Sequence, residues 1–151
     1  MNIIGIVSLA AKFSNQAMKI RINNAKYVSI SSMKLSLAKA KLKNNIPIPK
    51  GSAGLLTVTR EGKHPPRKHR QRVYPADDNY EGEKLFECDN IKISCDCEDW
   101  MFTWEFVQAR KGNADMIYCN GQPPVLKNPR LYPGLCKHLI VIMSFIMKKR
   151  I

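Results

Sequence analysis

The chain has 151 residues and a formal net charge of +13, from 25 Lys and Arg side chains against 12 Asp and Glu. This length suits one domain with an ordinary core, or a domain of about 100 residues that carries an extension. No apolar run approaches the roughly 18 residues needed to cross a bilayer, so we expect no membrane partner.

The charge is distributed unevenly along the chain. Residues 1–75 hold 15 of the basic side chains beside a single acid, Glu61, whereas residues 76–151 hold 10 basic and 11 acidic side chains. A half this basic favours a polyanion or an acidic protein surface as its partner. We therefore predict a basic, partly helical N-terminal arm over residues 1–50, followed by a second unit over residues 51–151.

Apolar side chains recur at a roughly helical spacing from Ile3 to Phe13, and more loosely up to residue 22. Residues 3–11 are similar to the apolar core of a signal peptide, but the basic stretch that should precede such a core is missing. A buried helix or an extended segment is therefore the preferred interpretation.

A second helix is predicted over residues 32–43, where three apolar side chains share one face and Pro47 and Pro49 follow. Residues 47–54 are interpreted as a linker. The lysines of this helix are candidate contacts to nucleic acid or to an acidic protein surface. A solvated helix face that only keeps the chain soluble is the open alternative. The candidate lysines are Lys39, Lys41 and Lys43.

Residues 54–61 alternate as a strand does, and Glu61-Gly62 is a turn signal. The following segment, 63–72, is predicted to be an irregular loop because it contains two prolines. Its five cations suit phosphate groups, but they carry no pattern that would read bases. His64 and His69 are interpreted as solvent-exposed rather than as metal ligands. The five cations are Lys63, Arg67, Lys68, Arg70 and Arg72.

The polarity reverses after Val73, and residues 76–99 carry a net charge of −7. The acids are scattered without a compact motif, which favours solvated charge and helix starts over catalysis or a hard-cation site. Residues 85–88 and 91–95 are predicted to form a β-hairpin around Asp89-Asn90.

A helix should begin near Glu98 or Asp99 and end at Gly112. Its aromatic side chains, which include Trp100 and Trp104, are more typical of a core than of a base-stacking platform. A proline-rich excursion then leads to a strongly apolar helix over residues 137–150. A helix with this composition is either deeply buried or covered by a partner.

Two pairs of soft ligands stand out, Cys95-Asp96-Cys97 and Cys136-Lys137-His138. In each pair one residue separates the members, and a structural zinc needs four such ligands at the corners of a tetrahedron. Five cysteines are an odd number, so a disulfide framework explains the sequence poorly. Cys88 and Cys119 lack closely spaced partners and are predicted to be buried free thiols.

This arrangement, Cys-x-Cys, an insert, then Cys-x-His opening an apolar helix, resembles the SWIM zinc finger. The insert resembles that of a subgroup encoded by tailed bacteriophages, with its Asn120-Gly121-Gln122-Pro123-Pro124 run and the later Pro133-Gly134. The resemblance covers about residues 54–147. It implies a small zinc-stabilised ββα unit with an insert helix, hence an α+β fold. It also implies the zinc ligands Cys95, Cys97, Cys136 and His138.

SWIM domains are credited with DNA binding and protein contacts, which leads to the expected function. We expect a non-enzymatic zinc-binding structural or interaction protein, a minor capsid or head-tail component of a phage virion. Its basic arm would anchor it to other protein chains or to packaged DNA, in the virion or in the host bacterial cytoplasm. The alternative is a sequence-nonspecific DNA-binding zinc-finger protein. The sequence offers no nucleophile-base pair or phosphate cradle, so we expect no enzyme and no small-molecule substrate.

Overall fold

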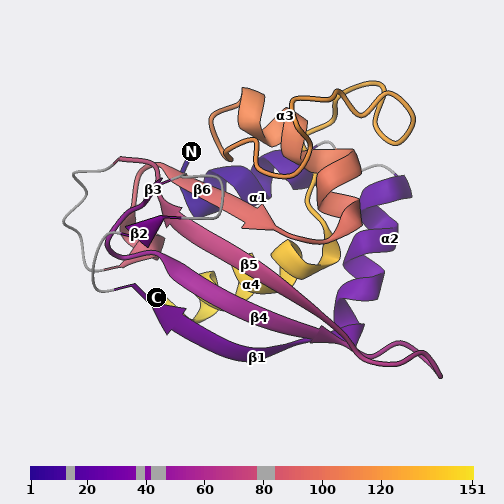
Figure 1. The fold of residues 1–151 in the computed structure, drawn as a ribbon, viewed down its shortest axis with the longest axis horizontal. Helices are drawn as coiled ribbons and strands as arrows, with labels where there is room; N and C mark the ends of the chain where they lie inside the picture. Colours follow the sequence, from indigo (N-terminus) through magenta and orange to yellow (C-terminus); the bar gives the residue numbers. More distant parts are fainter. Residues whose placement is uncertain (13–15, 37–39, 42–46, 78–83) are drawn as a thin grey trace.

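Antiparallel strands form the centre of the protein, and helices lie behind them and along the upper and right margins of the view (Figure 1). The computed structural model describes residues 1–12, 16–36, 40–41, 47–77 and 84–151. The helical elements are α1 (Ile3–Lys12), α2 (Gln16–Asn24), η1 (Ala25–Tyr27), η2 (Leu85–Glu87), the π-helical turn η3 (Trp100–Trp104), α3 (Glu105–Arg110) and α4 (Lys137–Lys149). The strands are β1 (Val28–Leu35), β2 (Ala40–Lys41), β3 (Pro47–Ile48), β4 (Ala53–Thr59), β5 (Arg67–Pro75) and β6 (Ile91–Cys95).

The main sheet has the order β1-β4-β5-β6, and β2 pairs with β3 in a separate small ladder. Every neighbouring pair in the main sheet is antiparallel. Helix α4 packs against the sheet, and α1 and α2 pack against α4. The predicted α+β class is therefore confirmed. Among the described residues, no helix has the length and apolar character that crossing a bilayer requires.

One hydrophobic core lies between the sheet and the helices. It joins Ile3 and Ile6 of α1 to Trp100 and to Ile142 of α4, and all four side chains are fully buried. Strand β1 pairs along its length with β4, from Val28 opposite Thr59 to Leu35 opposite Ala53. Sheet and core thus both cross the predicted division at residue 50.

The helix predicted over residues 32–43 is wrong, since residues 32–35 belong to β1 and residues 40–41 to β2, while residues 37–39, 42 and 43 lie outside the described residues. The serine-rich sequence of β1 has a weak helix preference. Pairing with β1 also satisfies the backbone N–H and C=O groups that β4 would otherwise expose at its edge. The predicted linker 47–54 is also wrong in part. It contains β3 and the first two residues of β4, and Ser52 within it is fully buried.

The irregular loop predicted over residues 63–72 is wrong from Arg67 onward, where β5 begins. The two prolines lie just before the strand, and His69 and Gln71 alternate with exposed cations. The predicted hairpin of 85–88 with 91–95 is also wrong. Residues 85–87 form the 3-10 turn η2, and β6 pairs with β5 instead.

The remaining helices follow the sequence patterns. The first segment is helical as α1, a helix starts at Glu98, and α4 covers residues 137–149. Gly112 has φ +79° just beyond α3, the left-handed conformation that ends many helices. Cys88 and Cys119 are free, buried thiols as predicted.

Candidate metal centre

Strand β6 delivers the first candidate ligand to the core. Ile91, Ile93 and Cys95 alternate with outward residues and are fully buried, so Cys95 reaches the helix side of the sheet as the strand ends. Cys97, two residues later, lies at the start of the next helix, where the Met101 N–H donates to its carbonyl. The Trp100 N–H lies 3.3 Å from the Cys97 sulfur and donates to it.

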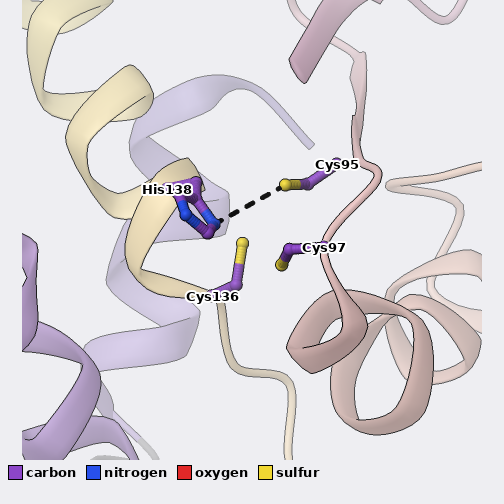
Figure 2. Close-up of side chains that lie close together, drawn as sticks. All are labelled: Cys95, Cys97, Cys136 and His138. Atoms are coloured by element: carbon purple, nitrogen blue, oxygen red, sulfur yellow. Dashed lines mark hydrogen bonds between the residues drawn. The ribbon is translucent and has the colours of Figure 1, made fainter. Parts of the chain in front are cut away.

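Helix α4 supplies the other two ligands. Cys136 is its N-cap, with extended backbone angles, and its carbonyl accepts the Ile140 N–H at 3.1 Å. His138 follows in the first turn, and its side chain points back toward the Cys136 sulfur (Figure 2). The two pairs come from opposite sides, one from the end of β6 and one from the start of α4.

The ligand atoms of Cys95, Cys97, Cys136 and His138 all lie within 4.8 Å of one another, and all four residues are buried. The Cys95 sulfur is 3.8 Å from His138 Nδ1, the contact dashed in Figure 2. A tetrahedral ion with metal–sulfur bonds of about 2.3 Å separates its sulfur atoms by about 3.8 Å. The four residues can therefore hold a metal ion. Thiolate and imidazole ligands suit a soft or borderline metal better than Mg²⁺ or Ca²⁺.

Side chains of β4 and β5 support these ligands. The hydroxyl of Thr59 lies 3.0 Å from His138 Nε2, which leaves Nδ1 directed toward the sulfurs. Gln71 Nε2 donates to the Cys95 sulfur at 3.5 Å and to the Thr57 hydroxyl at 2.8 Å. Such contacts orient metal ligands and stabilise sulfur charge.

The surroundings of the three thiols favour one thiolate rather than three. Burial raises the pKa of the Cys95 and Cys136 thiols. Hydrogen bonds from Cys136 and Cys95 instead lower the pKa of Cys97, which becomes the preferred thiolate of the three. A bound cation would supply the positive charge that allows all three sulfurs to ionise together.

An ion pair between Arg21 and Asp99 stabilises the start of the helix that follows Cys97. Arg21 of α2 donates to both oxygens of Asp99, with Nε at 3.0 Å from Oδ2, and this hydrogen bond raises the pKa of Arg21. Asp99 also accepts from Thr103 and from the indole of Trp104. The pair therefore ties α2 to the segment that carries Cys97.

His69 is not the solvent-exposed residue that the sequence suggested. Its ring is half-buried, with its centroid 4.6 Å from that of His138, and its Nδ1 lies 3.1 Å from Asp96. The hydrogen bond to Asp96 raises the pKa of His69. His69 nevertheless lies outside the four-residue cluster.

Those predicted basic surface residues that the structure describes come from several different elements. Lys63 lies in the turn before β5. Arg67, Lys68 and Arg70 are exposed on β5, and Arg72 there is half-buried. Lys41 belongs to β2, whereas Lys39 and Lys43 lie outside the described residues.

Sequence reasoning missed the residues that support the cluster. Thr59, Gln71 and Arg21 are far from the cysteines along the chain and belong to no motif. Only the strand register brings the first two to the ligands, so no sequence signal could have identified them. In comparisons with known proteins, no family model, no curated protein and no solved structure matches this chain.

Proposed function

We propose that the chain is a zinc-binding structural or interaction protein without catalytic activity, in which one ion joins the end of β6 to the start of α4. The observation that carries this proposal is the buried cluster of three cysteines and one histidine with mutually close ligand atoms. Zinc is the metal for which such a set is commonest in structural sites.

The ligand count supports a structural rather than a catalytic ion. Four protein ligands complete a tetrahedron and leave no position for a reactive water. Structural zinc contributes roughly 10–16 kcal/mol of binding free energy at neutral pH. This exceeds or matches the roughly 5–15 kcal/mol by which domains are stable, so folding would depend on the ion.

The experiment is metal analysis of the purified protein, followed by unfolding with and without a chelator. We expect one zinc per chain and loss of cooperative unfolding when the ion is removed. The variants Cys95→Ser and Cys136→Ser should lose the zinc. The matched controls Cys88→Ser and Cys119→Ser remove buried thiols outside the cluster and should keep it. Full zinc content in Cys136→Ser would refute the assignment.

The wider role follows from the SWIM resemblance and from the charge. We infer a minor component of a phage virion whose basic segments contact other protein chains or packaged DNA. Detection of the protein by mass spectrometry of purified particles tests this role, and its absence from them would contradict it.

The alternative, sequence-nonspecific DNA binding, is favoured by one observation. Lys68, Arg70 and Arg72 alternate along β5 on the side away from the metal cluster. Cations in such a row suit a phosphate backbone.

A further inference from the structure

The outer face of the main sheet is free of helices among the described residues. In Figure 1, α4 runs behind β4 and β5, and no helix crosses in front of them. The strand register places Lys34 of β1, Gly54 of β4 and Arg72 of β5 side by side in one row. Arg70 lies in the next row on the same face, opposite Leu56. This outer face is where β5 directs Lys68, Arg70 and Arg72.

A groove of about 900 Å³ crosses this face. Gly54 forms part of its floor, between Lys34 and Arg72. A Cβ atom at Gly54 would meet, among the residues that the structure describes, only the Lys34 carbonyl oxygen within 4 Å, at 3.8 Å, so the space above the glycine is open to them. The missing side chain therefore leaves a depression flanked by two cations.

The groove lining has the donors that contact phosphate and sugar in nucleic-acid complexes. Arg and Lys side chains neutralise phosphates, while Ser and Tyr hydroxyls donate to phosphate and sugar oxygens. Asp96, the one acid among the described lining residues, already accepts from the Arg70 backbone N–H and contacts His69. The cations are Lys34, Arg70 and Arg72, and the hydroxyl-bearing side chains include Ser32, Ser36 and Tyr118.

We propose that this groove binds the phosphate backbone of a single nucleic-acid strand, with Arg70 and Arg72 as its principal contacts. The proposal rests on the DNA-binding alternative above and is independent of the virion role. It locates the contact on the sheet rather than on the predicted arm lysines. The cations Lys34 and Arg72 flank the floor of the groove, whereas the core of a protein interface is depleted of charge.

The test measures binding of a fluorescent oligodeoxythymidylate of about 12 nucleotides to the zinc-loaded protein at low salt. The double variant Arg70→Ala/Arg72→Ala removes two contacts. The matched control Lys148→Ala/Lys149→Ala removes the same charge from exposed positions on α4, behind the sheet. Gly54→Val fills the floor without changing any charge. Zinc content and thermal unfolding of each variant establish that it remains folded.

We expect the arginine variant and Gly54→Val each to weaken binding at least tenfold, with little change in the α4 control. On a single strand, each phosphate contact contributes about −0.7 to the slope of the logarithm of the binding constant against the logarithm of the salt concentration. Loss of two contacts in the arginine variant should therefore make this slope less negative by about 1.4.

Three results would overturn the inference. Wild-type affinity in a folded Gly54→Val protein would mean that the strand does not enter the groove. The groove proposal would then be refuted, while DNA binding through general charge attraction would remain. Equal binding of polyglutamate would indicate an acidic protein as the partner. If the wild-type protein does not bind the oligonucleotide at low salt, the DNA-binding alternative is refuted as well. The zinc assignment does not depend on this result.

Discussion

Glu105, the first residue of α3, is fully buried and organises the chain after this helix. Its carboxylate accepts three backbone N–H groups, from Ile117 at 3.2 Å, Tyr118 at 2.9 Å and Cys119 at 2.7 Å. The variant Glu105→Gln keeps the volume of the side chain but replaces one oxygen by an amide group. Since an amide nitrogen cannot accept a hydrogen bond, at least one of the three N–H groups loses its partner.

The cost can be worked from these contacts. A hydrogen bond to a charged group contributes about 1.5–3 kcal/mol, and a buried unpaired N–H costs about 1–3 kcal/mol. Burial of a neutral amide costs less than burial of a carboxylate, which offsets part of this loss. We therefore expect Glu105→Gln to lower the free energy of unfolding by about 2–4 kcal/mol. For a chain of this length each kcal/mol lowers the melting temperature by about 2–4 °C.

Urea unfolding at neutral pH, followed by circular dichroism on zinc-loaded protein, measures this change. The matched control is Glu87→Gln, which makes the same substitution at an exposed residue and should alter the free energy of unfolding by less than about 0.5 kcal/mol. If Glu105→Gln unfolds at the same urea concentration as the control, the three hydrogen bonds do not support the fold and the reasoning is refuted.

Two further substitutions test packing and ligand support. Gly134→Ala would place a Cβ atom against Trp104, 2.7 Å from Cε3 and Cη2. We therefore expect urea unfolding to show that the free energy of unfolding falls by about 1–3 kcal/mol or more. Gly54→Ala is the neutral control, because no described atom would lie closer than 3.8 Å to its Cβ. Thr59→Val removes the hydroxyl beside His138 Nε2 and should weaken zinc affinity by roughly 10–100-fold in competition with a chromophoric chelator. Thr59→Ser should retain that affinity, and equal affinities of the two variants would contradict the supporting role.

The sequence allowed the candidate metal centre to be predicted because its signals are local. One residue separates the members of each ligand pair, and the alternation of Ile91, Ile93 and Cys95 indicates which side of β6 they face. The apolar composition of residues 137–150 likewise predicted α4, which is buried as a core helix. The short-range pattern of apolar residues was sufficient to predict β6 and α4 because the residues that it marks as apolar are the ones buried in the core.

The strands β1 and β5 could not be predicted, because their conformation depends on neighbours distant in sequence. Residues 32–35 share apolar and basic positions with a helix pattern, and only pairing with β4 makes them a strand. In β5 the inward residues His69 and Gln71 are polar, so apolar alternation is missing. They lie inside because Gln71 donates to Cys95 and His69 contacts Asp96. Contacts with Cys95 and with its neighbour Asp96 thus account for polar residues that the pattern alone places in solvent.

Strand β5 connects the two proposed sites of this protein. Its inward residue Gln71 contacts Cys95 of the candidate metal centre, while its outward residues Arg70 and Arg72 line the groove. A register shift of one residue would exchange these faces, directing Arg70 and Arg72 into the core and Gln71 into solvent. An ion held by Cys95 would fix the end of β6, and β6 pairs with β5 from Gln71 opposite Cys95 onward. Zinc would therefore set the register that keeps the cations on the outer face, although it lies on the other side of the sheet.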